Sequence, residues 1–236
     1  MQKKWVIADI HGCFKTLEKL IEFHIQPAQN DLFFFLGDYI DRGPKSKEVL
    51  DFLMHFSSQF SCSFLMGNHE EMFLKSHQES IQKRGFLSTF SKLPITESWK
   101  VHGGKETLDS FDTKTLKNID EKYIEWLSEL PNFIEEDDYL LVHAGFNFKK
   151  ENIFEDTESM RWIREFEVDF KKTNNKKVIH GHIPVSLSFI EECIQKNTYS
   201  FIDLDNGCVY KNYEGRGNLV ALELNSMNLK VQKNID

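Results

Sequence analysis

The sequence predicts an α/β fold built on a parallel sheet. Three short apolar segments, residues 4–8, 33–36 and 61–66, have the composition of buried strands, and each ends at a polar loop that contains glycine. Apolar residues at helical spacing follow these loops. A unit of strand, polar loop and helix that occurs three times is typical of a parallel sheet with right-handed crossovers. The three loops are then expected at the carboxyl edge of the sheet, where ligands bind in open α/β folds.

The clearest unit is the segment FFFLGDYIDRG at residues 33–43. Its first four residues are all apolar, which suits a strand buried on both faces. Asp38, Asp41 and Arg42 follow closely in a loop flanked by glycines. Taken alone, this loop could be a polar turn with a surface ion pair. The polar loops at the other strand ends argue for a binding site instead.

Length and composition limit the class of protein. The chain has 236 residues, 40% of them hydrophobic, which is enough for one core, so a single domain is expected over residues 1–236. A net charge of -8 argues against a sequence-independent nucleic-acid partner, which needs a basic face. No apolar run approaches the roughly 20 residues of a membrane span. We expect a cytoplasmic monomer without a membrane partner, whose four cysteines form no CxxC pair and are reduced.

Helices are predicted before and after the central strand in the sequence. Residues 14–24 have apolar positions at helical spacing, and residues 46–56 form a second helix with Ser46 as its N-cap. The third strand, residues 61–66, then leads into the sequence GNHE at residues 67–70.

Residues 71–130 differ in kind, because they are charged and helical and carry no motif at a strand end. We expect a helical insertion that packs beside the sheet as a partial lid and selects the substrate. Its apolar packing positions are Met72, Phe73, Phe86, Leu87 and Phe90.

Within this insertion a sharp turn is expected at residues 102–104, before a short helix over 105–111, and a second helix over 119–130 is stopped by Pro131. Trp99 and Trp126 are interpreted as packing residues. His102 is interpreted as a loop residue.

The remainder is predicted to be mainly β structure. A hairpin of residues 133–134 and 139–142 leads to His143, and a strand over 176–179 leads to the sequence HGHIP at 180–184. A short helix is expected within residues 159–166. The other expected strands, all antiparallel, are residues 189–194, 199–202, 208–211, 219–224 and 229–232.

Polar side chains accumulate at the predicted strand ends. They are carboxylates, an amide, imidazoles and one guanidinium, with no thiolate: Asp9, His11, Asp38, Asp41, Arg42, Asn68, His69, His143 and His182. This ligand set suits manganese, iron or zinc. Six good ligands are too many for one open ion, whereas two ions about 3.5 to 4 Å apart that share a carboxylate would use all six. Structural zinc is disfavoured because such sites are usually closed by thiolates.

Five motifs, DIHG, GDYIDRG, GNHE, HAG and GHIP, occur in this order over nearly the whole chain. The series resembles the calcineurin-like metallophosphoesterase superfamily, and more closely its PPP-type bacterial serine/threonine protein phosphatases. The resemblance implies a two-sheet β-sandwich core flanked by helices, with the helical lid at about residues 71–130. It also implies two divalent transition-metal ions, most simply Mn²⁺, with iron or zinc as alternatives.

The resemblance assigns metal ligands residue by residue. Asp9 and His11 would bind the first ion and Asp38 would bridge the two. The ligands completing the second site would be Asn68, His143 and His182.

The resemblance also implies the catalytic roles. His69 would be the general acid that protonates the leaving oxygen, oriented by Asp41. Arg42 and Arg164, the latter in the pattern Trp-Ile-Arg, would bind the phosphoryl group together with Asn68. Arg161 is the alternative to Arg164.

Three further positions are not ligands under this resemblance. His180 and Asp205 are expected to be neighbours of the site. Pro184 stands where diester-cleaving members often carry a further histidine, which favours the PPP-type branch.

The resemblance implies a serine/threonine phosphatase that cleaves phosphomonoesters by attack of a hydroxide bridging the metals. The alternative is a symmetrical bis(5'-nucleosyl)-tetraphosphate hydrolase, which shares these motifs and differs in the lid. A broad small-molecule phosphomonoesterase also stays open. An inactive metal-binding regulatory module is disfavoured, because Asp41, Arg42, His69 and Arg164 are all present. The expected partners are a phosphorylated protein or a small phosphoester.

Overall fold

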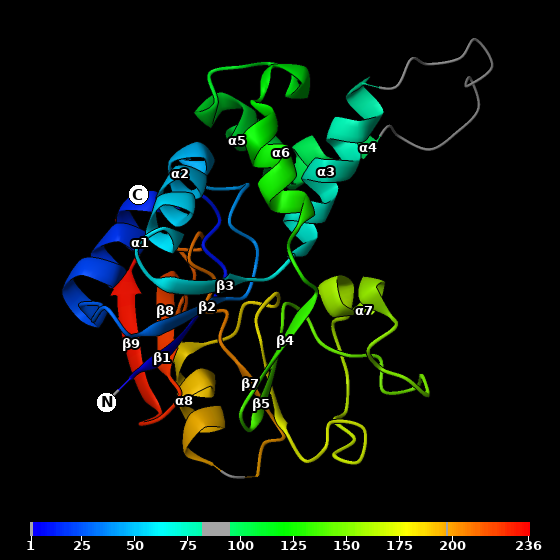
Figure 1. Ribbon diagram of the computed structural model, residues 1–236. Coiled ribbons are helices and arrows are strands. Elements are labelled where there is room, and N and C mark those ends of the chain that lie inside the picture. The colour runs from blue at the N-terminus through cyan, green and yellow to red at the C-terminus, as the bar shows by residue number, and fades with distance from the viewer. Residues whose placement is uncertain (1, 82–94, 197) are drawn as a thin grey trace.

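The computed structural model describes residues 2–81, 95–196 and 198–236, and their strands form two sheets (Figure 1). One sheet contains β1 (Lys4–Ile7), β2 (Leu32–Phe35), β3 (Ser61–Phe64), β8 (Asn218–Glu223) and β9 (Asn228–Lys233), in the order β3-β2-β1-β8-β9. The other contains β4 (Phe133–Glu136), β5 (Tyr139–Val142), β6 (Lys177–His180) and β7 (Phe201–Asp203), in the order β4-β5-β6-β7. The predicted α/β class with a two-sheet core is confirmed.

Strand directions follow the predicted plan in the first half of the chain. The pairs β1/β2 and β2/β3 are parallel, and β4/β5 is an antiparallel hairpin. The hairpin β8/β9 is antiparallel and joins the first sheet beside β1. The prediction that all later strands are antiparallel is wrong for β7, which pairs in parallel with β6.

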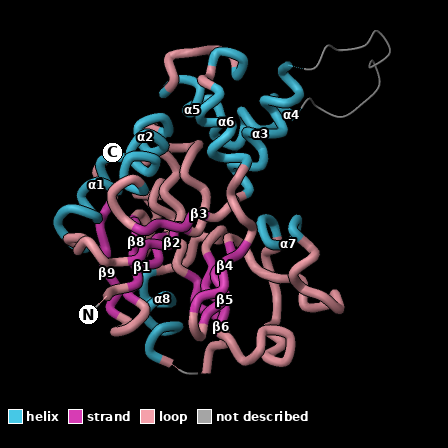
Figure 2. The backbone as a smooth tube through the Cα atoms, in the orientation of Figure 1, coloured by secondary structure: helices cyan, strands magenta, loops and turns pink. Residues whose placement is uncertain are grey.

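One apolar core lies between the two sheets, which Figure 2 shows as two magenta layers, and a larger one lies between the first sheet and the helices on its other face. Successive side chains of β2 point to opposite faces of the sheet, which explains this arrangement. Phe34 packs into the cluster shared with residues of the second sheet, such as Leu141 and Ile179, whereas Phe33 and Phe35 pack against helices on the other face. The strand is therefore buried on both faces, as its composition predicts.

Nine helices or helical segments surround the sheets in the described residues. They are α1 (Phe14–Lys19, continued as a π-helical turn at Leu20–Ile25), α2 (Ser46–Ser57), α3 (Asn68–Ile81), α4 (Ile95–Trp99, continued as a π-helical turn at Lys100–Gly104), α5 (Lys105–Ser110), a 3₁₀ turn (Leu116–Asn118), α6 (Glu121–Ser128), α7 (Thr157–Trp162) and α8 (Leu187–Gln195). The described part of residues 71–130 is thus helical, and α3 to α6 lie together at the top of Figure 1. The predicted packing positions Phe86, Leu87 and Phe90 lie outside the described residues. None of the described helices is long and apolar enough to cross a membrane.

The structure differs from the predicted secondary structure in three segments. Residues 189–194 form most of helix α8 instead of a strand, because Ile190 and Cys193 lie three residues apart and pack together into the inter-sheet core. Ser186 caps this helix by accepting the N–H of Phe189. Residues 208–211 are a turn rather than a strand. The short helix expected within 159–166 ends at Trp162, after which the backbone is extended.

Ser46 is the first residue of α2 and not its N-cap, which is Lys45. The Ser46 hydroxyl instead accepts the N–H of Asp41 at 3.0 Å. A residue predicted to begin a helix therefore supports the loop that carries Asp41.

Candidate active site

The loops that follow β1, β2, β3, β5 and β6 converge, and Asp38 lies at their centre. Its Oδ2 is 3.5 Å from Nε2 of His11, and its Oδ1 is 3.4 Å from Nε2 of His143. The backbone joins the first two loops, because the carbonyl of Asp38 accepts the N–H groups of Ile10 and His11. The predicted residues that the structure brings into this cluster are Asp9, His11, Asp38, Asp41, Arg42, Asn68, His69, His143 and His182.

Two groups of side chains could each hold a metal ion, and Asp38 belongs to both. One group is His11, Asp38 and His69, and the other is Asp38, His143 and His182, with the ligand atoms of each group within 4.8 Å of one another. Two neighbouring ions commonly share such a carboxylate. Asp38 therefore lies where a bridging ligand would have to be.

Backbone carbonyls fix the tautomers of His11 and His143. Nδ1 of His11 lies 3.0 Å from the carbonyl of Ile40, and Nδ1 of His143 lies 2.9 Å from the carbonyl of Leu36. Because a carbonyl can only accept, each Nδ1 carries the proton and each Nε2 presents its lone pair towards Asp38. Burial lowers the pKa of His143 to about 3 and the pKa of His11 well below its ordinary range, so both rings are neutral. Neutral imidazoles oriented in this way are typical of metal ligands.

Asn68 supplies an oxygen between two imidazoles. Its Oδ1 lies 3.0 Å from Nε2 of His143 and 2.9 Å from Nδ1 of His182. Nε2 of His143 is unprotonated, so it and Oδ1 of Asn68 offer lone pairs that one cation could bind. Ligands bound at about 2.1 Å and at right angles around one ion are about 3.0 Å apart. The spacing of these atoms therefore fits a shared ion.

Unpartnered buried atoms also fit bound cations. Among the described residues, Oδ1 of Asp9 and Nε2 of His182 are buried without a hydrogen-bond partner. Burial, together with the charges of Asp205 and Asp38, raises the pKa of Asp9 well above its ordinary value. Burying several carboxylates together is costly, and a divalent ion removes that cost. The donor set accommodates manganese, iron or zinc alike.

His69 and Asp41 form a buried pair beside this cluster. Nδ1 of His69 lies 2.7 Å from Oδ2 of Asp41, and Nε2 of His69 lies 3.9 Å from Oδ2 of Asp38. Burial raises the pKa of Asp41 to about 7 and lowers that of His69 to about 4. An imidazole held through Nδ1 by a carboxylate, with Nε2 directed at the cluster, has the geometry of a general acid, and the same Nε2 is within reach of the first ligand group.

The three arginines near the cluster have different environments. Nη1 of Arg42 lies 2.6 Å from Nε2 of His11, inside the cluster. Arg164 is exposed, and its charge contributes to lowering the pKa of His182, after the larger effect of burial. Arg161 is committed elsewhere, because it pairs with Glu71 at 2.8 Å and donates to Asn132. Arg164 is thus the arginine of this segment that is open to a phosphoryl group.

His180 and Asp205 lie next to the cluster and have structural partners. His180 packs between the rings of Phe166 and Phe201, at centroid distances of 5.1 and 5.4 Å. Asp205 accepts the N–H of Gly207 at 2.7 Å and so shapes the turn after β7. The charge of Asp205 still acts on Asp9.

Three residues that the sequence analysis gave no role at the site support it directly. Glu70 is buried, and its carboxylate accepts the N–H groups of Asp38, Tyr39 and Gly67 at 2.8 to 3.1 Å, which ties the second and third loops together. Trp99 and Thr107 donate hydrogen bonds to Asp41. The only available signal for Glu70 was its place in the GNHE motif; Trp99 was interpreted as packing alone.

The site backbone is unusual. His11, Asp38, Asp41, Arg42 and His182 all have positive φ, between 48° and 74°. Residues other than glycine adopt this region rarely, at a cost of order 1 kcal/mol or more each, and such residues cluster at functional sites. The surrounding contacts therefore hold these five side chains in positions that a relaxed backbone would not give.

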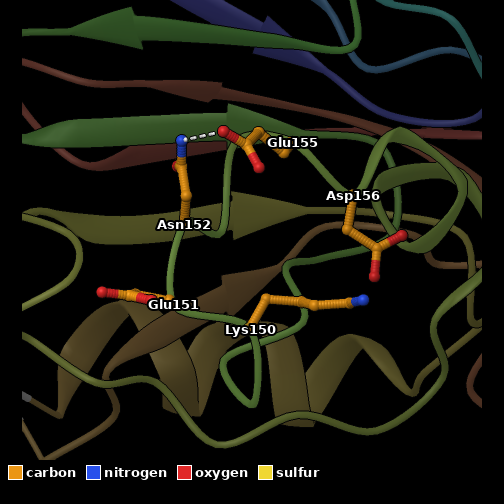
Figure 3. A pocket seen from close by; sticks show the side chains of 5 residues that line it. All are labelled: Lys150, Glu151, Asn152, Glu155 and Asp156. Carbon is orange, nitrogen blue, oxygen red and sulfur yellow. Dashed lines mark hydrogen bonds between the residues drawn. The ribbon is translucent and has the colours of Figure 1, made fainter.

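A separate surface hollow of about 800 Å³ is lined by Lys150, Glu151, Asn152, Glu155 and Asp156 (Figure 3). Asn152 donates to Glu155, as the dashed line in Figure 3 shows, and Asp156 caps α7. None of these residues belongs to the strand-end cluster.

Comparisons with known proteins agree with this geometry. A sequence model of the family described as Calcineurin-like phosphoesterase matches residues 3–196. A symmetrical bis(5'-nucleosyl)-tetraphosphatase of Vibrio campbellii is 28% identical over 143 residues, which cover 61% of this chain and 44% of the relative. The chain therefore matches less than half the length of that protein.

Solved structures share the fold over nearly the whole chain. A protein serine/threonine phosphatase from Saccharomyces cerevisiae has a TM-score of 0.61 and 15% identity, covering 100% of this chain and 81% of that one. A cold-active protein-tyrosine phosphatase of a psychrophilic Shewanella has a TM-score of 0.59 and 17% identity, covering 99% and 81%. At these identities the likeness concerns the fold alone.

Proposed function

Because the chain belongs to the calcineurin-like phosphoesterase family, we propose that it is a hydrolase with two divalent metal ions that cleaves dinucleoside tetraphosphates symmetrically. The observation that carries the reaction class is the shared position of Asp38 in two potential ligand groups. The proposed ligands are Asp9, His11, Asp38, Asn68, His143 and His182. When bound, the metals would supply the nucleophile and neutralise phosphoryl charge.

The chain's own residues perform the remaining steps. Arg42 and Arg164 bind the phosphoryl oxygens from two sides of the cluster. His69 donates a proton from Nε2 to the departing oxygen, while Asp41 holds its Nδ1. The buried pair provides the geometry for this step, since Nδ1 lies 2.7 Å from the carboxylate.

The choice of a dinucleotide over a phosphoprotein departs from the first expectation of the sequence analysis. Its support is the similarity to symmetrical tetraphosphatases and a pair of tyrosines beside Arg42. The guanidinium of Arg42 lies 6.0 Å from the ring of Tyr210, which in turn contacts the exposed ring of Tyr213 at 5.6 Å. Aromatic rings beside a phosphate-binding arginine suit a substrate that joins phosphates to bases.

A serine/threonine phosphomonoester is the second candidate substrate. Trp162 is exposed and its ring contacts that of His182, and Arg164 is exposed in the same segment. This side of the cluster is therefore accessible to a substrate as large as a protein.

The test is a side-by-side assay of metal-depleted protein supplied with manganese, on diadenosine tetraphosphate and on a phosphoserine peptide. We expect turnover of the dinucleotide to two diphosphate products, with little turnover of the peptide. Tyr213→Ala should raise KM for the dinucleotide by about 5- to 100-fold, the value of one lost stacking contact. Its KM for phenyl phosphate should not change.

Turnover of the peptide alone would replace the dinucleotide by the second candidate and keep the metal and catalytic assignments. If neither substrate is turned over and phenyl phosphate is still cleaved, the remaining function is that of a small-molecule phosphomonoesterase.

A further inference from the structure

Both oxygens of the Asp41 carboxylate accept hydrogen bonds from buried side chains. Oδ2 accepts from Nδ1 of His69 at 2.7 Å and from Nε1 of Trp99 at 2.8 Å. Oδ1 accepts from the hydroxyl of Thr107 at 2.6 Å. All four side chains are almost completely buried, so water cannot replace any of these bonds. Each donor therefore restricts how the carboxylate can rotate.

The direction of these hydrogen bonds is fixed by chemistry. An indole N–H can only donate, so Trp99 requires an acceptor at Oδ2. The single proton of Thr107 goes to Oδ1, because a carboxylate oxygen can only accept, and the same hydroxyl accepts the backbone N–H of Asp41 at 2.9 Å. The hydroxyl of Ser46, 3.0 Å from Oγ1 of Thr107, then donates to Thr107. The chain of bonds ends on Asp41, which leaves Nδ1–H of His69 as its remaining donor.

Trp99 and Thr107 both belong to the helical segment 95–110. Two glycines allow this segment to lie against the loop that carries Asp41. The carbonyl of Gly103, whose φ is 111°, accepts the N–H of Arg42 at 3.2 Å. A Cβ atom at Gly103 would lie 2.4 Å from that nitrogen, and one at Gly104 would lie 2.2 Å from the Trp99 ring. The close approach of this segment to the loop therefore depends on the absence of side chains at 103 and 104.

We propose that Trp99 and Thr107 are positioning residues, which hold Asp41 so that His69 delivers its proton to the leaving oxygen. The inference rests on the proposed role of His69. The step uses the imidazolium form of His69, which carries a proton on each ring nitrogen. As the P–O bond breaks, its electron pair moves to the leaving oxygen, which takes the proton from Nε2. The N–H electron pair stays on the imidazole, whose Nδ1–H remains bonded to Asp41. The helical insertion thus takes part in the chemistry in addition to any contact with substrate.

The test compares leaving groups, because only a poor leaving group needs a proton. We expect Thr107→Val and Trp99→Phe to lower kcat for phenyl phosphate by about 10- to 100-fold, within the usual contribution of a general acid. The kcat for 2,4-dinitrophenyl phosphate should fall by less than about 3-fold. Thr107→Ser keeps the hydroxyl and should restore the phenyl phosphate rate. Trp126→Phe is the matched control, since Trp126 packs on Phe64 and Tyr39 and should affect neither rate.

His69→Asn separates this inference from the proposed function. If His69→Asn lowers both rates equally, His69 is not the acid and the underlying proposal fails. A second outcome is that His69→Asn lowers mainly the phenyl phosphate rate, whereas the Trp99 and Thr107 variants lower both rates equally or lower neither. That outcome overturns the positioning role alone.

A readout independent of turnover is the proton NMR signal of Nδ1–H in His69. Its burial and short bond to Asp41 should give a slowly exchanging downfield signal in wild type and Thr107→Ser. The signal should shift or exchange faster in Thr107→Val and Trp99→Phe. Unchanged signals in both of these variants, with native thermal unfolding, would contradict the inference.

Discussion

At the residue scale, Gly181 shows how closely the loops approach one another. A Cβ atom at this position would lie 2.2 Å from Oδ1 of Asp9. That oxygen is buried and has no partner in the described part of the chain. The glycine therefore keeps open the side from which Asp9 would reach a metal.

Gly181→Ala is expected to displace the Asp9 carboxylate and to weaken metal binding by about 10- to 100-fold, as disturbance of ligand orientation usually does. Titration calorimetry with Mn²⁺ measures the change. Gly215→Ala is the control, because its added methyl group would meet only Ser186 at 3.4 Å; its φ of 73° adds backbone strain that Gly181, whose φ is not positive, does not carry. Equal Mn²⁺ affinity in both variants would refute this role of Gly181.

At the scale of elements, Glu71 joins α3 to the end of α7. Its carboxylate accepts from Nη2 of Arg161 at 2.8 Å and from Nε1 of Trp162, two residues before Arg164. Burial alone would raise the pKa of Glu71, but the hydrogen bonds of Trp162 and Lys75 and the charge of Arg161 outweigh it and lower the pKa below 4.5. Glu71 therefore fixes the segment that presents Arg164.

Glu71→Gln is expected to lower the free energy of unfolding by about 0.5 to 1 kcal/mol at pH 7, because the pair is partly exposed. Below pH 4.5 the unfolded chain protonates Glu71 before the folded one does, so this stabilisation is lost as pH falls through the lowered pKa. Urea midpoints at pH 7 and pH 3.5 measure the difference between wild type and variant, which should shrink at the lower pH. Glu97→Gln, in an exposed pair with Lys100, should show little effect at either pH. A difference for Glu71→Gln that is the same at both pH values would contradict the argument.

The strand-end residues were predictable because each follows a short apolar segment and a glycine or turn residue lies close by. The helix α8 could not be predicted, because a short apolar segment such as residues 189–194 suits a strand or a buried helix equally well. The bonds from Trp99 and Thr107 to Asp41 join positions 58 and 66 residues apart, and no local pattern encodes such contacts. The positive φ of Asp41 and Arg42 likewise depends on the loops that surround them.

At the scale of the whole molecule, the cluster of buried carboxylates should make stability depend on metal. Saturating metal at about 100 times its Kd would add about 2.7 kcal/mol to the free energy of unfolding. For a chain of 236 residues this corresponds to a rise of about 5 to 11 °C in Tm.

Thermal unfolding of metal-depleted protein with and without Mn²⁺ measures this rise. Asp38→Asn removes a buried negative charge, so its metal-free Tm should equal or exceed that of wild type, while its response to Mn²⁺ should be mostly lost. A full Mn²⁺ response in Asp38→Asn would exclude Asp38 as a shared ligand.

The position of β1 has a consequence for synthesis on the ribosome. This strand lies in the middle of its sheet, between β2 and β8, and Trp5 pairs with Glu223. At about 5 to 20 residues per second, roughly 10 to 40 s separate the synthesis of the two partners. During that interval one edge of an apolar strand has no neighbour. The nascent chain should therefore be most prone to aggregation, and most dependent on chaperones, until its last hairpin has emerged.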